Sequence, residues 1–257
     1  MIERITPVIL TFNESPNIAR TLGKLTWARD IVVVDSLSGD DTLEKARAFP
    51  NVRTFKRKFD RHADQWNFAI AETGIETEWV LALDADYVLS DELVEELPAL
   101  KPADDTAGYR ASFVYCVHGR RLRGSLYPPV TVLYRRDRSR YLQDGHTQRI
   151  QVDGTVADLR SPILHDDRKP LASWISSQNR YMALEAELIR ATPWSGLSWP
   201  DRIRKLRFVA PFFVLLYCLV VKGGLLNGRA GWFYAFQRLT SEVTLSLHLL
   251  RGDLSAN

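Results

Sequence analysis

The run Trp79-Val-Leu-Ala-Leu-Asp-Ala-Asp86 constrains the fold of this chain more than any other stretch. A short apolar run bounded by polar residues is typical of a strand that is buried on both faces. Asp84 and Asp86 then lie at the carboxyl end of that strand, where open α/β sheets bind their ligands. Two carboxylates one residue apart can share a divalent cation. The structural alternative is a turn rich in aspartate that caps the next helix.

The residues before this strand alternate between β-branched runs and helical patterns. Strands are predicted at residues 5–12, 31–35 and 52–55, and helices begin after capping residues near Pro16 and Asp41. Polar residues gather at the strand ends, which predicts a doubly wound α/β sheet. No G-x-G-x-x-G follows the first strand and no Walker A lysine motif is present. A dinucleotide oxidoreductase and a P-loop phosphotransferase are therefore disfavoured.

The pattern is less regular beyond Pro102. Residues 109–117 and 130–135 alternate like strands, and residues 171–190 have apolar side chains at helical spacing. Cys116 and Cys218 both lie in apolar runs, which favours two buried thiols over a disulfide. The formal charge of +3 and the pI near 8.9 are too mild to indicate a nucleic-acid partner.

The last part of the chain is apolar and basic. Residues 208–221 carry no charge, but they are fewer than the roughly 20 residues that span a bilayer. Between Arg202 and Ser241 there are seven Lys or Arg and no Asp or Glu. This asymmetry favours helices that lie on anionic lipid, and the alternative is that they only cover the core. Four glycines predict a flexible hinge between the helices: Gly223, Gly224, Gly228 and Gly231.

Several motifs, taken in order, resemble one family. They are Thr11-Phe-Asn-Glu14, the run Val-Val-Val-Asp35-Ser-Leu-Ser-Gly-Asp-Asp-Thr42, Gln65-Trp-Asn67 and Leu83-Asp-Ala-Asp86. Their order and spacing are similar to family 2 inverting glycosyltransferases, above all to the bacterial subgroup that builds lipopolysaccharide cores and related surface glycans. The later segments Leu164-His165, Asn179-Arg-Tyr181, Glu185-Ala186 and residues 223–231 are also similar to that subgroup.

The resemblance implies an α/β fold of the GT-A type. Its nucleotide-binding half is Rossmann-like with a mixed sheet, and amphipathic or hydrophobic helices follow at the carboxyl end. Three parts are expected on this basis. Residues 1–105 bind the nucleotide sugar, residues 106–200 bind the acceptor, and residues 201–257 form a helical tail that associates with the membrane.

The resemblance also assigns roles to residues at the strand ends. Thr11, Glu14 and Asp35 match positions that line the nucleotide base and ribose. Asp84 and Asp86 match the D-x-D motif that binds Mg²⁺ or Mn²⁺ with the donor phosphates, and Asp86 is the expected direct ligand. The structural alternatives are an acid that complements a helix dipole for Glu14 and a turn acid for Asp35.

Two further residues have weaker assignments. Arg61 lies just before the helix expected at residues 65–71, where it can contact phosphate or remain solvated. His165 follows a strand-like run, and GT-A enzymes often complete the metal site with a histidine or aspartate late in the chain. A buried structural histidine is the alternative for His165.

The catalytic base departs from the subgroup's pattern. An inverting transfer needs a base that deprotonates the acceptor hydroxyl. The subgroup has a His-Glu pair where this chain has His146-Thr147, so Asp144 or His146 itself is the candidate base. The alternative for His146 is that it holds phosphate. Asp144 is equally compatible with a turn before Gly145. Tyr87 stands where the subgroup usually has glutamate after the D-x-D.

Taken together, these features predict a metal-dependent inverting glycosyltransferase. Its donor is a nucleotide-diphosphate sugar, with UDP the expected nucleotide, and its acceptor is a lipid-linked saccharide. The expected location is peripheral, on the cytoplasmic face of the bacterial inner membrane. Two alternatives are a nucleotidyltransferase, although the glycine-rich basic loop that such enzymes need is missing near the start, and a catalytically inactive glycan-binding or scaffold protein on the same fold.

Overall fold

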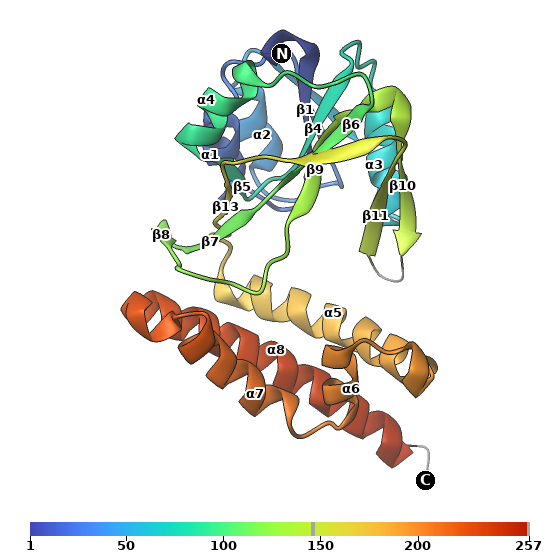
Figure 1. The fold of residues 1–257 in the computed structure, drawn as a ribbon, viewed down its shortest axis with the longest axis vertical. Helices are drawn as coiled ribbons and strands as arrows, with labels where there is room; N and C mark the ends of the chain where they lie inside the picture. The colour runs from blue at the N-terminus through green and yellow to red at the C-terminus, as the bar shows by residue number, and fades with distance from the viewer. Residues whose placement is uncertain (145–146, 256–257) are drawn as a thin grey trace. The chain divides into compact units, whose positions relative to one another are not determined.

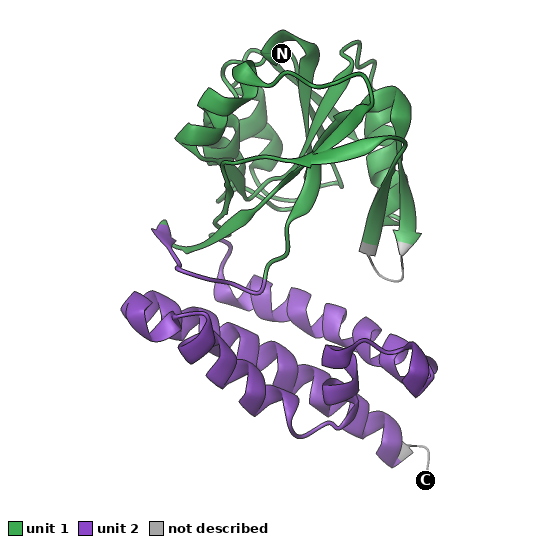
Figure 2. Ribbon diagram, viewed as in Figure 1, with its two compact units in different colours: residues 1–119, 127–168 green, residues 120–126, 169–257 purple. Residues whose placement is uncertain are grey.

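The computed structural model describes residues 1–144 and 147–255, without the side chains of residues 144, 147 and 255. The chain forms two compact units, coloured separately in Figure 2. Unit 1 consists of Met1–Gly119 and Tyr127–Arg168, and unit 2 consists of Arg120–Leu126 and Lys169–Asn257. Both cysteines are buried free thiols, as the sequence predicts. The functional boundaries near residues 105 and 200 stay a prediction.

Unit 1 is built on a seven-stranded mixed sheet (Figure 1). Its strands lie in the order β12 (Thr155–Asp158), β6 (Thr106–Ala111), β9 (Val130–Arg135), β4 (Trp79–Asp84), β1 (Ile5–Thr11), β2 (Ile31–Asp35) and β3 (Val52–Lys56). Strands β4, β1, β2 and β3 are parallel, whereas β9 runs antiparallel to both β4 and β6. The predicted mixed sheet is therefore confirmed.

Both faces of the sheet are covered (Figure 1). Helices α1 (Ile18–Gly23), α2 (Thr42–Arg47) and α4 (Asp91–Ala99) cover one face, and α3 (His62–Ala71) covers the other together with the hairpin β10 (Ser139–Asp144)–β11 (Thr147–Val152). Successive side chains of a strand point to opposite faces of the sheet, so they pack into different cores. Val33 faces the core that contains Leu22 and Leu93, whereas Val34 faces the core of Trp66 and Tyr141.

A second, small sheet lies beside the first. It contains β5 (Tyr87–Leu89), β13 (Ile163–His165) and β7 (Phe113–Val117). The sequence predicts one strand over residues 109–117, but the structure has two strands that belong to different sheets. The chain leaves the large sheet at Ser112, whose carbonyl accepts a hydrogen bond of 2.9 Å from the Ile163 amide. The pairing of the following residues with β13 therefore sets the end of β6.

Unit 2 is helical in its described part apart from the short strand β8 (Arg120–Arg121). Its helices are α5 (Leu171–Ala191), α6 (Trp199–Lys205), α7 (Ala210–Leu216) and α8 (Gly228–Ser255), and a π-helical turn at Tyr217–Val221 extends α7. Helices α5 and α8 pack together through Ala186, Ile189, Leu245 and Leu249, all of which are buried. Short 3₁₀ turns at Trp194–Gly196 and Gly224–Asn227 connect the helices.

The four glycines of the predicted hinge have different roles. Gly223 has a φ of +68° and lies at the break between two helical segments that meet at 64°. Gly228 and Gly231 belong to α8. A Cβ on Gly231 would lie 1.9 Å from the Gly224 carbonyl oxygen, so Gly231 permits a close contact of two backbones.

Candidate active site

The carboxyl ends of β1, β2 and β4 meet at one edge of the sheet, as the sequence predicts. Thr11 is paired with Asp35 across β1 and β2, and Leu10 is paired with Asp84 across β1 and β4. The Asp35 side chain is completely buried and accepts a hydrogen bond of 3.0 Å from the Thr11 hydroxyl. A buried carboxylate fixed in this way can accept a hydrogen bond from a nucleobase N–H.

Two strained loops follow β1 and β2 at this edge. Asn13 and Leu37 are not glycines, yet their φ values are +53° and +65°. The loops are joined because the Asn13 amide donates to the Ser38 hydroxyl at 2.9 Å, and the Asn13 side chain accepts from the Gly39 amide at 2.9 Å. Strained backbone that neighbouring structure holds in place is common at ligand-binding sites.

Glu14 lies at the base of the first loop. Its carboxylate accepts a hydrogen bond of 2.8 Å from the side chain of Asn17, and its amide donates to the Thr42 hydroxyl at 2.8 Å. Glu14 and Asn17 are both buried. The nucleotide-binding role predicted for Glu14 stays a prediction, and the structure adds that Glu14 orients Asn17.

Asp84 and Asp86 follow β4, and the structure brings His165 to Asp86. His165 Nε2 lies 3.1 Å from Asp86 Oδ2, although 79 residues separate them in the chain. Burial lowers the pKa of His165, but the carboxylates of Asp86, Asp84 and Asp167 together outweigh burial and raise it above its ordinary value. This contact unites two of the three predicted metal ligands, and Asp84 also raises the His165 pKa through its charge.

Aromatic rings enclose the histidine. The rings of Tyr127, Tyr115 and Tyr87 lie 4.8, 4.9 and 5.3 Å from the His165 ring. The hydroxyl of Tyr87 hydrogen-bonds to that of Tyr127, and burial raises the pKa of both phenols. Tyr87, which departs from the subgroup's glutamate, therefore forms part of the wall around His165.

The segment after His165 is anchored by charges that the sequence analysis missed. Asp166 is buried and accepts hydrogen bonds from Arg20 Nη1 at 2.8 Å and from Arg168 Nε at 2.9 Å. Asn17 donates to Asp167 at 2.9 Å and accepts from the Arg168 amide at 2.9 Å. The amide of Asp166 donates to the Asp86 carbonyl at 3.1 Å. These bonds fix the position of His165 relative to the D-x-D.

The side chains of Asp84, Asp86 and His165 are suitable ligands for a divalent cation. Carboxylate and imidazole groups together bind Mn²⁺ and related ions. Two adjacent ligands of an octahedral ion with bonds of about 2.1 Å lie about 3 Å apart, which is the separation of Asp86 Oδ2 and His165 Nε2. The other ring nitrogen, His165 Nδ1, is buried without a hydrogen-bond partner. Within the described ranges, no group of three or more His, Cys, Asp or Glu residues forms a ready cage.

Arg61 and the candidate catalytic base are the remaining predicted site residues. Arg61 precedes α3, its side chain is 64% exposed, and its Nε donates to Asp64 at 2.6 Å. The Asp144 side chain and all of His146 lie outside the described residues. Their predicted role as the base stays a prediction.

The Gln65-Trp-Asn67 motif joins three parts of unit 1. Gln65 is buried and its amide donates to the Ser36 hydroxyl at 3.1 Å, next to Asp35. Trp66 stacks on Tyr141 with the ring centroids 5.3 Å apart. Asn67 donates to the Tyr141 carbonyl and accepts from its amide, both at 2.9 Å. The motif thus fixes the β10–β11 hairpin against α3.

The sequence model that describes glycosyl transferase family 2 matches residues 6–158 of this chain. The chain belongs to this family. It is therefore a transferase by family, and the predicted resemblance is confirmed. The match covers the two strand-end loops and the D-x-D, whereas His165 and the Asp166 anchor lie beyond it.

Curated relatives agree with this assignment. The chain is 28% identical over 272 residues to the lipopolysaccharide core biosynthesis glycosyltransferase LpsC of Rhizobium meliloti, and the match covers 96% of this chain and 94% of LpsC. It is 34% identical over 96 residues to an uncharacterized glycosyltransferase of Rickettsia prowazekii, which covers 37% of this chain and 32% of that protein.

The fold is shared with a solved mannosyltransferase. PcManGT from Pyrobaculum calidifontis, solved in complex with GDP-Man and Mn²⁺, superposes with a TM-score of 0.53 at 15% sequence identity. The superposition covers 96% of this chain and 87% of PcManGT. At this identity the likeness concerns the fold, and together with the seven-stranded mixed sheet it confirms the predicted GT-A class.

Proposed function

We propose that this protein transfers a sugar, with inversion, from a nucleotide-diphosphate donor to a lipid-linked saccharide in bacterial surface glycan synthesis. The observation that carries the proposal is the meeting of Thr11–Asp35 and Asp86–His165 at one edge of the sheet. A nucleoside site and a cation site at adjacent strand ends suit a donor whose diphosphate lies between them.

The acceptor is inferred from the near full-length relative. LpsC is named for lipopolysaccharide core biosynthesis, and the similarity extends over both units of the present chain. A saccharide on a lipid anchor is presented at a membrane surface. We therefore place the enzyme at the cytoplasmic face of the inner membrane, as a peripheral protein.

The residues have distinct roles in the proposed reaction. Asp35, held by Thr11, accepts a hydrogen bond from the nucleobase and so orients the donor. Asp86, with Asp84 and His165, would hold Mg²⁺ or Mn²⁺, which would supply positive charge to neutralise the leaving diphosphate. Asp144 or His146 takes the proton of the attacking acceptor hydroxyl, which approaches the anomeric carbon opposite the leaving group. This geometry inverts the anomeric configuration.

Calorimetric titration with UDP, GDP, CDP and ADP, each with and without Mn²⁺, tests the donor half of the proposal. We expect one nucleotide, UDP, to bind with metal-dependent affinity. Asp86→Ala abolishes the metal dependence, whereas Asp158→Ala, on the outermost strand β12 with β6 and β9 between it and β4, leaves it intact. Absence of binding to all four nucleotides, or unchanged affinity in Asp86→Ala, would refute the assigned site.

A further inference from the structure

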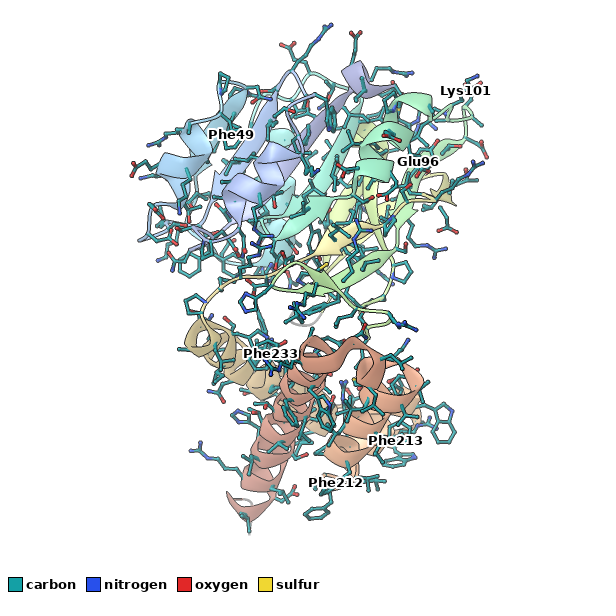
Figure 3. The ribbon with its side chains drawn as sticks, turned by 90° about the vertical axis from the view of Figure 1, so that its left-hand side faces the viewer. Phe49, Glu96, Lys101, Phe212, Phe213 and Phe233 are labelled. Atoms are coloured by element: carbon teal, nitrogen blue, oxygen red, sulfur yellow. The ribbon has the colours of Figure 1, made fainter. Side chains whose placement is uncertain are left out.

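Helix α7 and its π-helical extension are apolar on every side. Val214, Cys218 and Leu219 are buried on the side that packs against α8. The opposite side, which we call the α7 face, consists of Phe212, Phe213, Leu216 and Val220, which are 71%, 55%, 62% and 63% exposed. Phe212 and Phe213 project from the outer surface of the helix in Figure 3. A helix that is hydrophobic all round is normally covered by protein or by lipid.

The charges around α7 favour an anionic partner. Seven Lys or Arg and no Asp or Glu occur between Arg202 and Ser241. The two acids that border this stretch, Asp201 and Glu242, both pair with Arg204, at 3.1 and 2.7 Å. Further along the chain, Asp253 accepts from Arg207 at 2.8 Å. These carboxylates therefore add little repulsion toward a negative surface. The same pairs neutralise Arg204 and Arg207, so the attraction depends on the other five basic residues of the stretch: Arg202, Lys205, Lys222, Arg229 and Arg238.

Aromatic and basic side chains occur together on both sides of α7 in the chain. The Arg202 guanidinium lies 5.4 Å from the ring centroid of Trp199, whose side chain is 76% exposed. The Lys222 ammonium lies 5.6 Å from the ring centroid of Tyr217. Trp and Tyr paired with cationic groups are typical of the headgroup region of a membrane.

The length of α7 limits how it meets a bilayer. The segment Ala210–Val221 has twelve residues, which extend about 18 Å as a helix, against a hydrocarbon core of about 30 Å. Among the described residues no single helix passes the length and hydropathy test for a span, although Ala210–Val221 and Gly224–Leu254 pass it together as a bent pair. One side of α7 also packs against α8, so that side is not available to lipid.

We propose that the α7 face is a lipid-insertion surface. The helix lies in the plane of an anionic phospholipid bilayer, with Phe212, Phe213 and Leu216 at the boundary between headgroups and acyl chains, and with the flanking basic residues at the phosphates. The sequence predicts membrane association only for the tail as a whole. The structure assigns the contact to one helix and to four side chains.

Co-sedimentation of the full chain with vesicles tests the proposal. We expect binding to vesicles of phosphatidylcholine with 30% phosphatidylglycerol and much weaker binding to phosphatidylcholine alone. Phe212→Ser with Phe213→Ser removes two inserted rings and lowers the partition coefficient roughly tenfold or more. The matched control, Leu247→Ser with Leu254→Ser, changes equally exposed apolar residues of α8 and leaves the partition coefficient near the wild-type value.

A second measurement shows whether α7 enters the bilayer. The wild-type chain already contains seven tryptophans, including the exposed Trp199, so the measured quantity is the quenching in Phe212→Trp beyond that of the wild type. We expect brominated lipids to give the largest excess when the bromine is near the headgroup. Equal loss of binding in both double variants, quenching strongest at the bilayer centre, or a lipid-free dimer that Phe212→Ser disrupts would each overturn the proposal. UDP binding is measured on every variant, so loss of membrane binding through the α7 face is distinguished from loss of the nucleotide site.

Discussion

Replacing Asp166 with alanine tests whether the buried charge cluster holds the site together. The Asp166 side chain is 6% exposed and accepts hydrogen bonds from Arg20, from two nitrogens of Arg168 and from the Gly119 amide. Its removal leaves the half-buried Arg20 guanidinium without its carboxylate partner. Burial already lowers the pKa of Arg20, which shows that its charged form is poorly solvated.

The expected cost follows from burial. Removing one partner of a buried ion pair destabilises a protein by roughly 3–5 kcal/mol. The Arg168 side chain is 39% exposed and regains water, so we expect the lower end, about 3 kcal/mol, in the free energy of unfolding. Urea denaturation followed by circular dichroism measures this loss as a lower midpoint.

Asp158→Ala is the matched control for Asp166→Ala. Asp158 also pairs with an arginine through two hydrogen bonds to Arg110, but both side chains are exposed. Exposed pairs contribute little, so this variant should unfold close to the wild-type midpoint. Equal losses in the two variants, or no loss in Asp166→Ala, would refute the reasoning that burial makes the Asp166 cluster essential.

Two other variants test the proposed nucleobase contact of Asp35 and the packing of the β10–β11 hairpin. Asp35→Ala removes the acceptor for the nucleobase, so the affinities for UDP and uridine should fall by a similar factor, about tenfold or more, in calorimetry; a loss confined to UDP would contradict this role. Asn67→Ala removes both hydrogen bonds to the Tyr141 backbone and should cost about 1–2 kcal/mol. Amide hydrogen exchange in residues 139–143 should then accelerate, and unchanged exchange would show that the Trp66–Tyr141 stack alone holds the hairpin.

The sequence predicts the parts of the fold that depend on the pattern of apolar and polar residues within one short segment. The apolar runs at β1, β2 and β4 are buried on both faces, and a buried parallel strand must place its last polar residue at the carboxyl edge. For this reason Thr11, Asp35 and Asp84 could be placed together before their contacts were known. Asp86 was placed at the carboxyl end of β4 by the same pattern, and the metal role of His165 followed from the family resemblance. The hydrogen bond between them came only from the structure.

The parts that escaped prediction depend on contacts between distant residues. Arg20 and Asp166 are 146 positions apart, and Asn17 and Asp167 are 150 apart. An arginine on a short helix and two acids after a histidine have no local signal that pairs them. The break at Ser112 escaped for the same reason, because the partner strand β13 comes about 50 residues later.

The central claim is that the protein transfers a sugar with inversion, and product analysis tests it most directly. The full chain is incubated with Mn²⁺, the nucleotide sugar that binds, and lipid-linked saccharide extracted from bacterial membranes. The coupling constant of the new anomeric proton is then measured by NMR. The account predicts a glycoside whose anomeric configuration is opposite to that of the donor. A product with the donor's configuration would contradict the inverting mechanism, and tight donor binding without any product would indicate a glycan-binding protein that has lost catalysis.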